Sequence, residues 1–364
     1  TGNPQITFFK VVYRRHTNFS MEAIEQTFNG SADFGKRVTC TVSRNGDLMH
    51  KVYLQVTVPA NDGAGGYCAN LGHALIKYAE VEIGGQRIDK HYGDWMHIWN
   101  ELSQEAGKKT GYGLMTAAAA GLAVETDLYI PLEFWFCRNP GLALPLIALQ
   151  YHEVKINIEF RALSELTADT GLSLSAASLY VDYIYLDTDE RRRFAQVSHE
   201  YLIEQVQFTG DESVSSISNK IKLNFNHPCK ELVWVVQRDS SVTPLQRFDY
   251  TDKDDVNPVL IAKLQLNGHD RFSERMGRYF NLVQPYQHHT NVPKAGINVY
   301  SFGLKPEEHQ PSGTCNMSRI DNATLQLTLT ANTVAGGDAK VRVYATNYNV
   351  LRIMSGMGGL AYSN

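Results

Sequence analysis

Apolar and polar residues alternate along many short segments of the chain, and this pattern predicts strands. Residues 38–42, 52–58 and 154–160 carry apolar side chains at every second position. Turn-forming pairs such as Asn45-Gly46 and Gly84-Gly85 separate such segments. A period of two places alternate side chains on one face of a strand. Many short strands bounded by turns are typical of a β-sandwich or barrel.

A few segments break this alternation. Trp95, Ile98, Trp99 and Leu102 recur with helical spacing, which predicts a short amphipathic helix over residues 95–105. The alanine-rich residues 114–124 are predicted to form a helix or a mobile loop. Strands are expected to resume over residues 128–136, with the sequence LYIPLEFWF.

The pattern of the first half of the chain recurs in the second half. Phe28 and Gly30 match Phe208 and Gly210, 180 positions further on. The alternating Val52, Leu54 and Val56 match Leu232, Trp234 and Val236 at the same offset, and Gly85 in VEIGGQR matches Gly268 in LQLNGHD. A period this long indicates a duplicated domain, because solenoid repeats span only about 20–50 residues.

The duplication predicts two domains, residues 1–190 and 191–364, each with roughly eight short strands and a few short helices in loops. A chain of 364 residues is long enough for two cores. The all-β pattern fits two tandem eight-stranded jelly rolls, although the strand count also fits other sandwiches. We interpret the charged residues 187–210 as the joint, with mixed charges in a solvated seam that fixes how the two domains sit side by side.

The charge of the chain argues against direct, sequence-specific binding of nucleic acid. The formal net charge is −4, so there is no overall positive field to attract phosphates. The densest basic run, Arg191 to Arg193, follows Asp187, Asp189 and Glu190. Charges of both signs cancel within a Debye length of about 8–10 Å, so this run is interpreted as part of the solvated joint.

The cysteines and the apolar runs exclude two further classes of protein. The five cysteines are odd in number, widely spaced and outside any CxxC pair, which predicts reduced thiols rather than a disulfide framework or a zinc site. Residues 142–149 form a short apolar run interrupted by Pro145, far below the roughly 18–20 residues of a membrane span. No signal peptide is recognised, and a segment upstream of Thr1 stays open.

Several motifs resemble phosphate-binding or metal-binding sequences, but none of them is complete enough to predict a site. Residues 30–37 satisfy GxxxxGK but end in Arg37, where a P-loop has Ser or Thr, and a strand-like segment follows. The histidines lack metal-ligand spacing, so they are predicted to lie in loops; the pairs considered are His91 with His97 and His288 with His289. We therefore expect no metal site and no cofactor site.

A nucleophilic trio and four glycosylation sequons are also set aside. Cys315, His309 and Asp321 are near in sequence but lack an oxyanion-hole signature, so Cys315 is predicted to be a buried structural thiol. No catalytic residue is expected. Asn-x-Ser/Thr sequons occur by chance in any chain and are interpreted so here; their asparagines are Asn18, Asn29, Asn316 and Asn322.

A resemblance to a known family is carried by residues 296–325, GINVYSFGLKPEEHQPSGTCNMSRIDNATL. The chain resembles the major capsid proteins of large icosahedral double-stranded DNA viruses, most closely those of algal viruses of the chlorovirus type. The matching stretches span nearly the whole chain. The others are TGNPQITFFKVVYRRHTNF, VEIGGQRIDKHYGDW, PGLALPLIALQYHEVK, HEYLIEQVQFTG and YNVLRIMSGMGGLAY.

The resemblance implies two consecutive jelly rolls and a homotrimer of pseudo-hexagonal outline that tiles an icosahedral shell. The implied partners are neighbouring capsomers, minor capsid and penton proteins, and covalent surface glycans. An internal membrane lies near the shell and is not spanned. The implied localisation is the virion after assembly in the host cytoplasm, and the resemblance implies no catalysis.

The chain departs from this family in its loops. The connection between Trp234 and Leu264 is short and charged, and residues 330–338 form a brief loop, where related chains often carry longer insertions. The resemblance implies glycans on outward loops, on asparagines often outside the usual sequon, so no glycosylation site is transferred. Residues 1–20 are expected to act as an arm that ties neighbouring subunits together.

Two other functions fit a jelly roll without the resemblance. A carbohydrate-binding, lectin-like β-sandwich is the main alternative. A jelly-roll enzyme of the cupin type is disfavoured because its metal ligands are missing.

Overall fold

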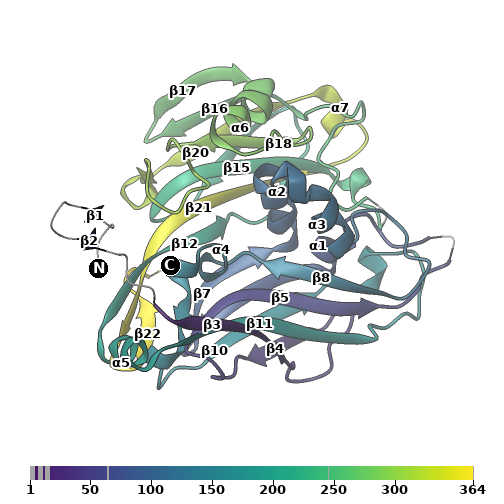
Figure 1. Cartoon of the computed structure of the whole chain (residues 1–364). Helices are drawn as coiled ribbons and strands as arrows, with labels where there is room; N and C mark the ends of the chain where they lie inside the picture. Colours follow the sequence, from purple (N-terminus) through teal and green to yellow (C-terminus); the bar gives the residue numbers. More distant parts are fainter. Residues whose placement is uncertain (1–4, 7–10, 13–16, 64, 245, 364) are drawn as a thin grey trace.

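The polypeptide forms two jelly rolls, each made of two antiparallel sheets that face one another (Figure 1). The computed structural model describes residues 5–6, 11–12, 17–63, 65–244 and 246–363. In the first jelly roll, one sheet has the order β4-β10-β6-β7 and the other β3-β11-β5-β8, with β9 paired to β5. Its strands are β3 (Phe19–Gln26), β4 (Arg37–Thr41), β5 (Leu48–Val58), β6 (Ile76–Ile83), β7 (Gln86–Tyr92), β8 (Thr126–Leu132), β9 (Leu144–Pro145), β10 (Val154–Phe160) and β11 (Ala176–Leu186).

The second jelly roll repeats this topology and adds two short strands, β13 and β22. One sheet has the order β14-β20-β16-β17 and the other β12-β21-β15-β18, with β19 paired to β15 in the place of β9, and β13 and β22 paired to β21. Its strands are β12 (His199–Phe208), β13 (Glu212–Val214), β14 (Ser218–Leu223), β15 (Pro228–Arg238), β16 (Val259–Leu266), β17 (His269–Met276), β18 (Ile297–Ser301), β19 (Cys315–Asn316), β20 (Ala323–Leu329), β21 (Ala339–Met354) and β22 (Met357–Leu360).

The matching sheet orders confirm the duplication and the double jelly roll predicted from the sequence. The central strands β5 and β15 have equal length and begin 180 positions apart, at Leu48 and Pro228. Leu54 and Trp234 both point inward and are fully buried. One matched pair differs, however, because Phe28 packs on the first core whereas Phe208 packs outside the second core. The edge strands β3 and β12 are therefore shifted relative to one another, which a sequence offset cannot reveal.

The helices are short and lie in the connections between strands. The helix predicted over residues 95–105 is confirmed as α2. The stretch 114–124 is helical only at its beginning, since α3 ends at Met115. The strand expected over 128–136 ends at Leu132, and its aromatic end forms α4 instead, because that run no longer alternates. The helices are α1 (Leu71–Leu75), α2 (Gly93–Ser103), α3 (Lys109–Met115), α4 (Trp135–Arg138), α5 (Thr188–Gln196), α6 (Gln284–His288) and α7 (Ala331–Val334), with a π-helical turn at Tyr279–Val283 and 3-10 turns at Ala106–Lys108, Pro140–Leu142, Leu146–Ala148, Leu163–Glu165, Asp239–Ser241 and Met317–Arg319.

The tight turns after β6 and β16 have the same backbone geometry. Gly84 and Gly85 have φ angles of 56° and 85°, and Asn267 and Gly268 have φ angles of 51° and 80°. Two consecutive positive φ values are characteristic of a type I′ hairpin, whose twist matches the twist of the strands. The structure thus supports the use of glycine at both predicted turns.

Each jelly roll has its own hydrophobic core, but the end of β21 contributes to both. This strand runs for 16 residues from the second jelly roll toward the first, drawn in yellow in Figure 1. Near its end, Leu351 and Ile353 are buried in the core cluster of the first jelly roll, together with Ile203 of β12. The two halves are therefore joined by shared strands as well as by the connecting segment.

The interpretation of residues 187–210 as a solvated seam between the domains is correct only in part: residues 187–198 connect the two jelly rolls and are largely exposed, but they form α5 on one end of the first jelly roll instead of a seam between the two. Asp187 caps α5 by accepting a hydrogen bond from the amide of Thr188 at 2.8 Å, and Arg191 pairs with Asp47 of the first jelly roll at 2.9 Å. Phe194 packs on a small apolar cluster of the same jelly roll. The remainder of the segment is β12, an integral strand of the second jelly roll. The charges hold α5 on one end of the first jelly roll, because Asp47 offers a carboxylate there.

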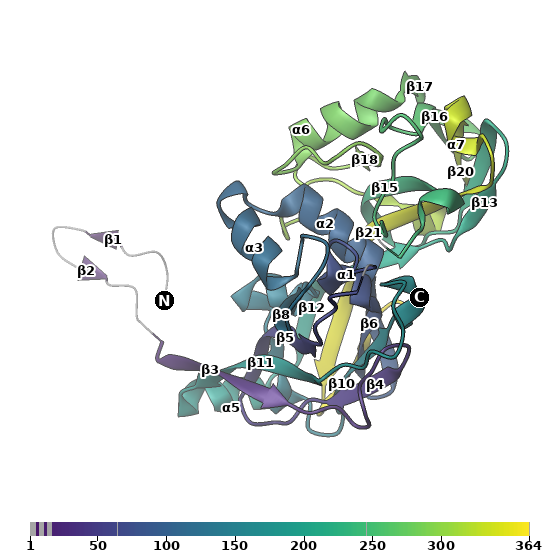
Figure 2. The ribbon, with the colours of Figure 1, turned by 90° about the vertical axis from the view of Figure 1, so that its right-hand side faces the viewer.

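The N-terminal arm lies mostly outside the described residues. Of positions 1–20 the structure describes 5–6, 11–12 and 17–20, and β1 (Gln5–Ile6) pairs antiparallel with β2 (Val11–Val12). Figure 2 shows these two strands apart from both jelly rolls. Among the helices that the structure describes, none has the length and apolar character needed to cross a membrane.

Candidate functional site

The P-loop-like segment connects two strands, as predicted. Residues 27–36 join β3 to β4, and Arg37 begins β4. The guanidinium of Arg37 pairs with the Glu80 carboxylate at 2.8 Å, and Lys36 lies 3.8 Å from Asp33. The two basic residues thus pair with carboxylates of their own jelly roll.

Of the four histidines considered as ligands, only His289 lies in a loop as predicted, whereas the others lie in β7, α2 and α6. His91, His97 and His289 are buried. His91 lies in β7 with Nε2 2.9 Å from Asp89 Oδ2, and His97 lies in α2 and stacks on Phe248 at 4.4 Å. Burial lowers the pKa of His97 well below its usual value. Because His91 and His97 have different partners, they form no pair. Within the described ranges, no three His, Cys, Asp or Glu side chains are placed to hold a metal ion.

His289 is the histidine with the most distinctive environment. Its Nε2 lies 2.7 Å from Glu231 and its Nδ1 lies 2.8 Å from Glu307. Burial alone would lower the pKa of His289, but the two carboxylates raise it to about 9. The ring is therefore a buried cation at neutral pH, held between two anions. Its neighbour His288 instead contacts the Leu304 carbonyl oxygen through Nδ1.

The structure does not bring Cys315, His309 and Asp321 together. Cys315 of β19 lies opposite Cys229 of β15 in the strand pairing, and both are free thiols. His309 lies against Glu204, while the amide of Asp321 donates to Asn267. Cys315 is only half-buried, and burial raises its pKa, which disfavours the thiolate. The four sequon asparagines are exposed: Asn18, Asn29, Asn316 and Asn322.

The two jelly rolls of the chain pack against each other through a large interface. Helix α2 of the first jelly roll lies on the outer face of the β12-β21-β15-β18 sheet of the second (Figure 1). The apolar stripe predicted for this helix faces that sheet, and Trp95 lies 5.4 Å from Tyr344, ring centre to ring centre. The buried cluster contains Trp95, Ile98, Trp99, Leu102, Val233, Val235, Tyr250, Ile297, Val299 and Tyr344. The sequence predicted the stripe, but no sequence signal indicated which surface covers it.

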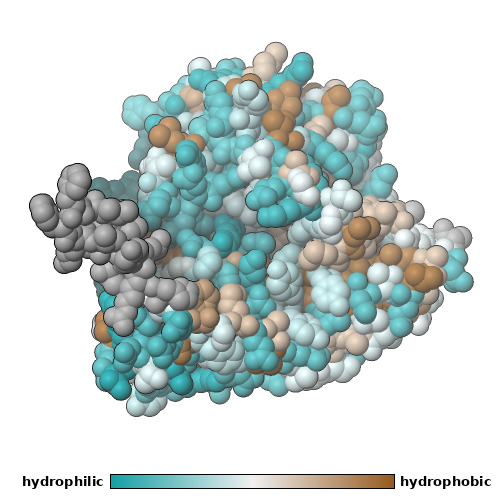
Figure 3. Space-filling view, in the orientation of Figure 1, coloured by the Kyte–Doolittle hydropathy of each residue, from teal (hydrophilic) through white to brown (hydrophobic). Residues whose placement is uncertain are grey.

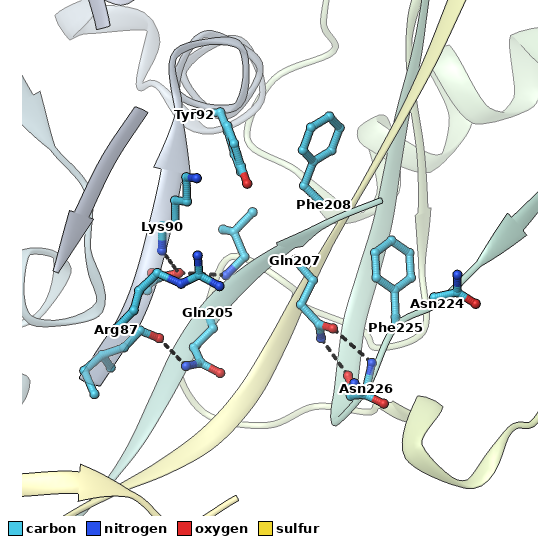
Figure 4. Close-up of a pocket in the computed structure, with 12 residues that line it drawn as sticks. Arg87, Lys90, Tyr92, Gln205, Gln207, Phe208, Asn224, Phe225 and Asn226 are labelled. Carbon is cyan, nitrogen blue, oxygen red and sulfur yellow. Dashed lines mark hydrogen bonds between the residues drawn. The ribbon is translucent and has the colours of Figure 1, made fainter. Parts of the chain in front are cut away.

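The edges of two sheets meet beside this helix. Strand β7 of the first jelly roll lies next to β12 of the second, where Asp89 Oδ1 accepts a hydrogen bond from the Val206 amide at 3.1 Å. Gln205 donates to the Ile88 carbonyl oxygen, and the rings of Tyr92 and Phe208 pack edge to face at 4.9 Å. Figure 4 shows these side chains around a small cavity of about 200 Å³. Polar contacts and an aromatic contact thus hold β7 against β12.

A buried ionic cluster joins the jelly rolls on the other side of β12. Arg138 of α4 pairs with Glu204 of β12 at 2.9 Å, and Lys230 of β15 contacts the same carboxylate at 2.5 Å. Burial alone would raise the pKa of Glu204, but His309, Arg138 and Lys230 together lower it to about 2. Glu204 is therefore ionised throughout the physiological range, and it pairs with the half-buried Arg138 of one domain and the buried Lys230 of the other.

A wider polar hollow of about 700 Å³ lies between the jelly rolls near α2. Arg247 of the second jelly roll pairs with Glu165 of the first at 3.3 Å. Arg342 pairs with Asp211 at 2.8 Å, and Arg161 lies 3.7 Å from Asp94. Six basic and four acidic side chains line the hollow, and each of the four acidic side chains lies within 4.0 Å of a basic one. These contacts support the role of a structural interface.

Family models match both halves of the chain. A model described as "Major capsid protein N-terminus" matches residues 7–187, and a model described as "Large eukaryotic DNA virus major capsid protein" matches residues 190–359. The major capsid protein of Pyramimonas orientalis virus is 62% identical over 395 residues, covering 100% of this chain and 96% of that protein. The major capsid protein of Paramecium bursaria Chlorella virus 1 is 45% identical over 423 residues, with the same coverage of both chains.

Solved structures agree with these matches. A quasi-atomic model of the PBCV-1 virus capsid contains a chain with a TM-score of 0.84 and 41% identity, covering 98% of this chain and 100% of that chain. The Faustovirus major capsid protein has a TM-score of 0.81 at 12% identity, with 96% and 93% coverage, and so shares the fold. No support is found for the lectin alternative. The chain belongs to the major capsid proteins of large eukaryotic DNA viruses, the structural proteins of the virion capsid.

Proposed function

We propose that three copies of this chain form a homotrimeric capsomer of pseudo-hexagonal outline, which tiles the icosahedral shell. The observation that carries this proposal is the internal repetition of one topology, with one jelly roll packed on the next through α2. Two near-equivalent units per chain supply six near-equivalent units per trimer. Such a trimer can fill a hexagonal position of a lattice.

The two units are proposed to be residues 1–190 and 191–364. The sheet memberships support this division, since all strands from β3 to β11 belong to one pair of sheets and all strands from β12 to β22 belong to the other. The family models also change between residues 187 and 190. The end of β21 and part of β12 contribute to the core of the first jelly roll, so we expect neither half to fold stably without the other. Expressing each half alone tests how independent the two units are.

The remaining expectations for this capsomer concern its surroundings. We propose that it contacts neighbouring capsomers, minor capsid and penton proteins, carries covalent glycans on outward loops, and assembles in the host cytoplasm above an internal membrane that it does not span. We propose no enzymatic activity. The resemblance to capsid proteins supports these points.

Light scattering coupled to size-exclusion chromatography tests the trimer. The expected mass is three times the chain mass of 40.8 kDa. A stable monomer at the concentrations used for assembly would contradict the proposal. A monomer that bound glycans specifically would instead revive the lectin-like alternative.

A further inference from the structure

The polar hollow between the two jelly rolls contains more basic than acidic side chains. Its volume is about 700 Å³, and six basic and four acidic side chains line it. Three of the basic residues are arginines. Arg161 follows β10 in the first jelly roll, whereas Arg247 and Arg342 belong to the second. The hollow is therefore bounded by cations from both jelly rolls.

The arginines lie deep in the hollow, whereas most of the carboxylates lie at its rim. The side chains of Arg161, Arg342 and Arg247 are only 6%, 8% and 13% exposed. The Asp94 side chain is 14% exposed. The other three acidic side chains are between 39% and 45% exposed: Glu165, Asp211 and Asp239. Because water and salt screen exposed charges more than buried ones, the interior of the hollow is more positive than its rim.

Arg161 has a fixed backbone and an unsatisfied side chain. Its amide donates to the Leu75 carbonyl oxygen at 2.8 Å, and its own carbonyl oxygen accepts from the Gly35 amide at 2.9 Å. Its guanidinium lies 3.7 Å from Asp94 and 3.9 Å from Glu165, and both distances exceed those of hydrogen bonds. Within the described residues, its buried Nε has no hydrogen-bond partner. An acceptor inside the hollow would remove the cost of this unpaired donor.

Arg247 approaches the same carboxylate from the second jelly roll. Its guanidinium lies 3.3 Å from Glu165 Oε1, the oxygen atom that also lies nearest to Arg161. Burial lowers the pKa of Arg247, and the charge of Arg161 lowers it further. One oxygen atom at the rim thus serves two cations that repel one another.

A further cation, Lys90 of β7, lines the same hollow. Its ammonium lies 4.0 Å from the centre of the Tyr78 ring and 5.2 Å from that of Tyr92, and Figure 4 shows the side chain extending toward Tyr92. In the part of the chain that the structure describes, no carboxylate lies within 4.0 Å of this ammonium. Its charge is therefore available to a ligand.

We propose that the polar hollow binds a diphosphate group, inorganic or part of a nucleotide, between Arg161 and Arg247. A guanidinium presents its N–H donors as a planar fork that matches phosphate oxygens. A tetrahedral phosphoryl group has oxygen atoms in several directions, so it can accept from guanidinium groups that approach from different jelly rolls. Two more basic than acidic side chains line the hollow, which fits a ligand with at least two negative charges.

A bound diphosphate connects the two jelly rolls within one chain, independently of the proposed trimer. It contacts the first jelly roll through Arg161 and the second through Arg247. The ligand can enter past the rim, where the side chains of Lys77 and Lys340 are 54% and 38% exposed. Because the site exists only when both jelly rolls are folded and packed together, the ligand is expected to raise the Tm of the chain.

Isothermal titration calorimetry of the full chain with sodium pyrophosphate, without divalent cations, tests the site. The wild type is expected to bind one diphosphate per chain. Arg161→Gln removes the fork and is expected to raise the dissociation constant at least about 10-fold. Arg352→Gln is the matched control, because Arg352 also pairs with a glutamate, Glu200, at 2.8 Å, but does not line the hollow. Its affinity should equal that of the wild type.

Weak contact of an anion with surface charges is the alternative to exclude, since hydrophilic residues cover most of the face drawn in Figure 3. Sodium chloride at matched ionic strength separates the two cases. An equal rise in Tm with chloride would refute the site. Absence of binding by the wild type, or equal affinities of the wild type and Arg161→Gln, would also refute it.

Two milder variants are used if Arg161→Gln has a lowered Tm. Arg161→Lys keeps the charge but not the fork, and Lys90→Gln removes the cation that lacks a carboxylate partner. Both are expected to weaken binding, and unchanged affinity in both would refute the inference. Titration with ADP then identifies the source of the diphosphate. Binding of ADP at least as tight as that of pyrophosphate assigns a nucleotide, and weaker binding assigns inorganic diphosphate.

Discussion

Arg138 and Glu204 form an ion pair of 2.9 Å that links α4 of the first jelly roll to β12 of the second; Glu204 is buried and Arg138 half-buried. The buried Lys230 completes the cluster from β15, which β21 separates from β12 in the sheet. Removing one partner of a buried pair leaves an uncompensated charge, which costs about 3–5 kcal/mol. The Glu204→Gln variant is therefore expected to lower the free energy of unfolding by that order, as measured by urea denaturation at pH 7. A variant of an exposed pair, Glu105→Gln beside Lys108, is the control and should change stability by less than about 1 kcal/mol.

The same carboxylate predicts a dependence on acid. The folded-state pKa of Glu204, about 2, lies below its ordinary value of 4.5, so folding favours the ionised form. Its contribution is present in full above pH 4.5 and is lost as the pH falls toward 2. Urea unfolding at pH 6 and pH 3 should show a larger loss for the wild type than for Glu204→Gln. Equal losses in the two proteins would remove Glu204 from the explanation.

His289 is expected to make the free energy of unfolding depend on pH in the opposite direction. Its folded-state pKa of about 9 lies above the ordinary value of 6.5, because Glu231 and Glu307 hold the charged ring despite burial. The stabilisation is present in full below pH 6.5 and is lost as the pH rises through 9. His289→Gln should abolish the fall in unfolding free energy between pH 6.5 and 9.5, whereas His288→Gln should retain it. Because the His289 ring lies 6.2 Å from that of Trp99 of α2, the loss is expected at the junction, where hydrogen exchange can locate it.

The hairpin turns test the backbone requirement separately from packing. Gly85 and Gly268 have φ angles of 85° and 80°, and a Cβ atom at either would meet nothing within 4 Å. Replacing either by Val should therefore cost only the strain of a left-handed residue, about 1–2 kcal/mol. Gly337→Val is the matched control, since that site is also open and lacks a positive φ. Equal melting temperatures for all three variants and the wild type would dismiss the argument from turn geometry.

The N-terminal arm remains a prediction from the sequence. Deleting residues 1–20 is expected to leave both jelly rolls folded and to weaken assembly. This deletion removes Phe19, so a deletion of residues 1–16 is the informative comparison. Light scattering and circular dichroism of both truncated chains would separate the arm from the start of β3, and unchanged assembly of both would contradict an assembly role for the arm.

Much of the fold could be predicted because the alternation within a strand and the repetition along the chain can both be recognised in the sequence alone. The spacing of apolar residues predicts the buried faces of β5 and β15 and the helical, amphipathic character of α2. The positions of the glycines predict the two turns. The partner of α2 could not be predicted, since an apolar stripe such as Trp95 to Leu102 indicates that something covers it but not what. The charged segment was misplaced for the same reason, because the partner of Arg191 is Asp47, far away in the sequence.

The register of the edge strands was the second feature that the sequence could not predict. Phe28 and Phe208 match in sequence, yet the first packs inward and the second packs against Tyr92 at the junction. A small shift of an edge strand is invisible in a periodic pattern, and it decides which face a side chain occupies. The buried histidines were missed similarly, because His289 is held by two glutamates distant from it in sequence.

The continuous passage of the chain through α5 changes how a ring of six units forms. In the proposed capsomer, three of the six contacts between neighbouring jelly rolls are made within a chain, where the partners are held at a high effective concentration. Ring closure then requires three bodies to meet rather than six, and its equilibrium depends on the third power of chain concentration instead of the sixth. A short charged helix that joins the two jelly rolls would thereby let shells begin to form while the protein is still dilute.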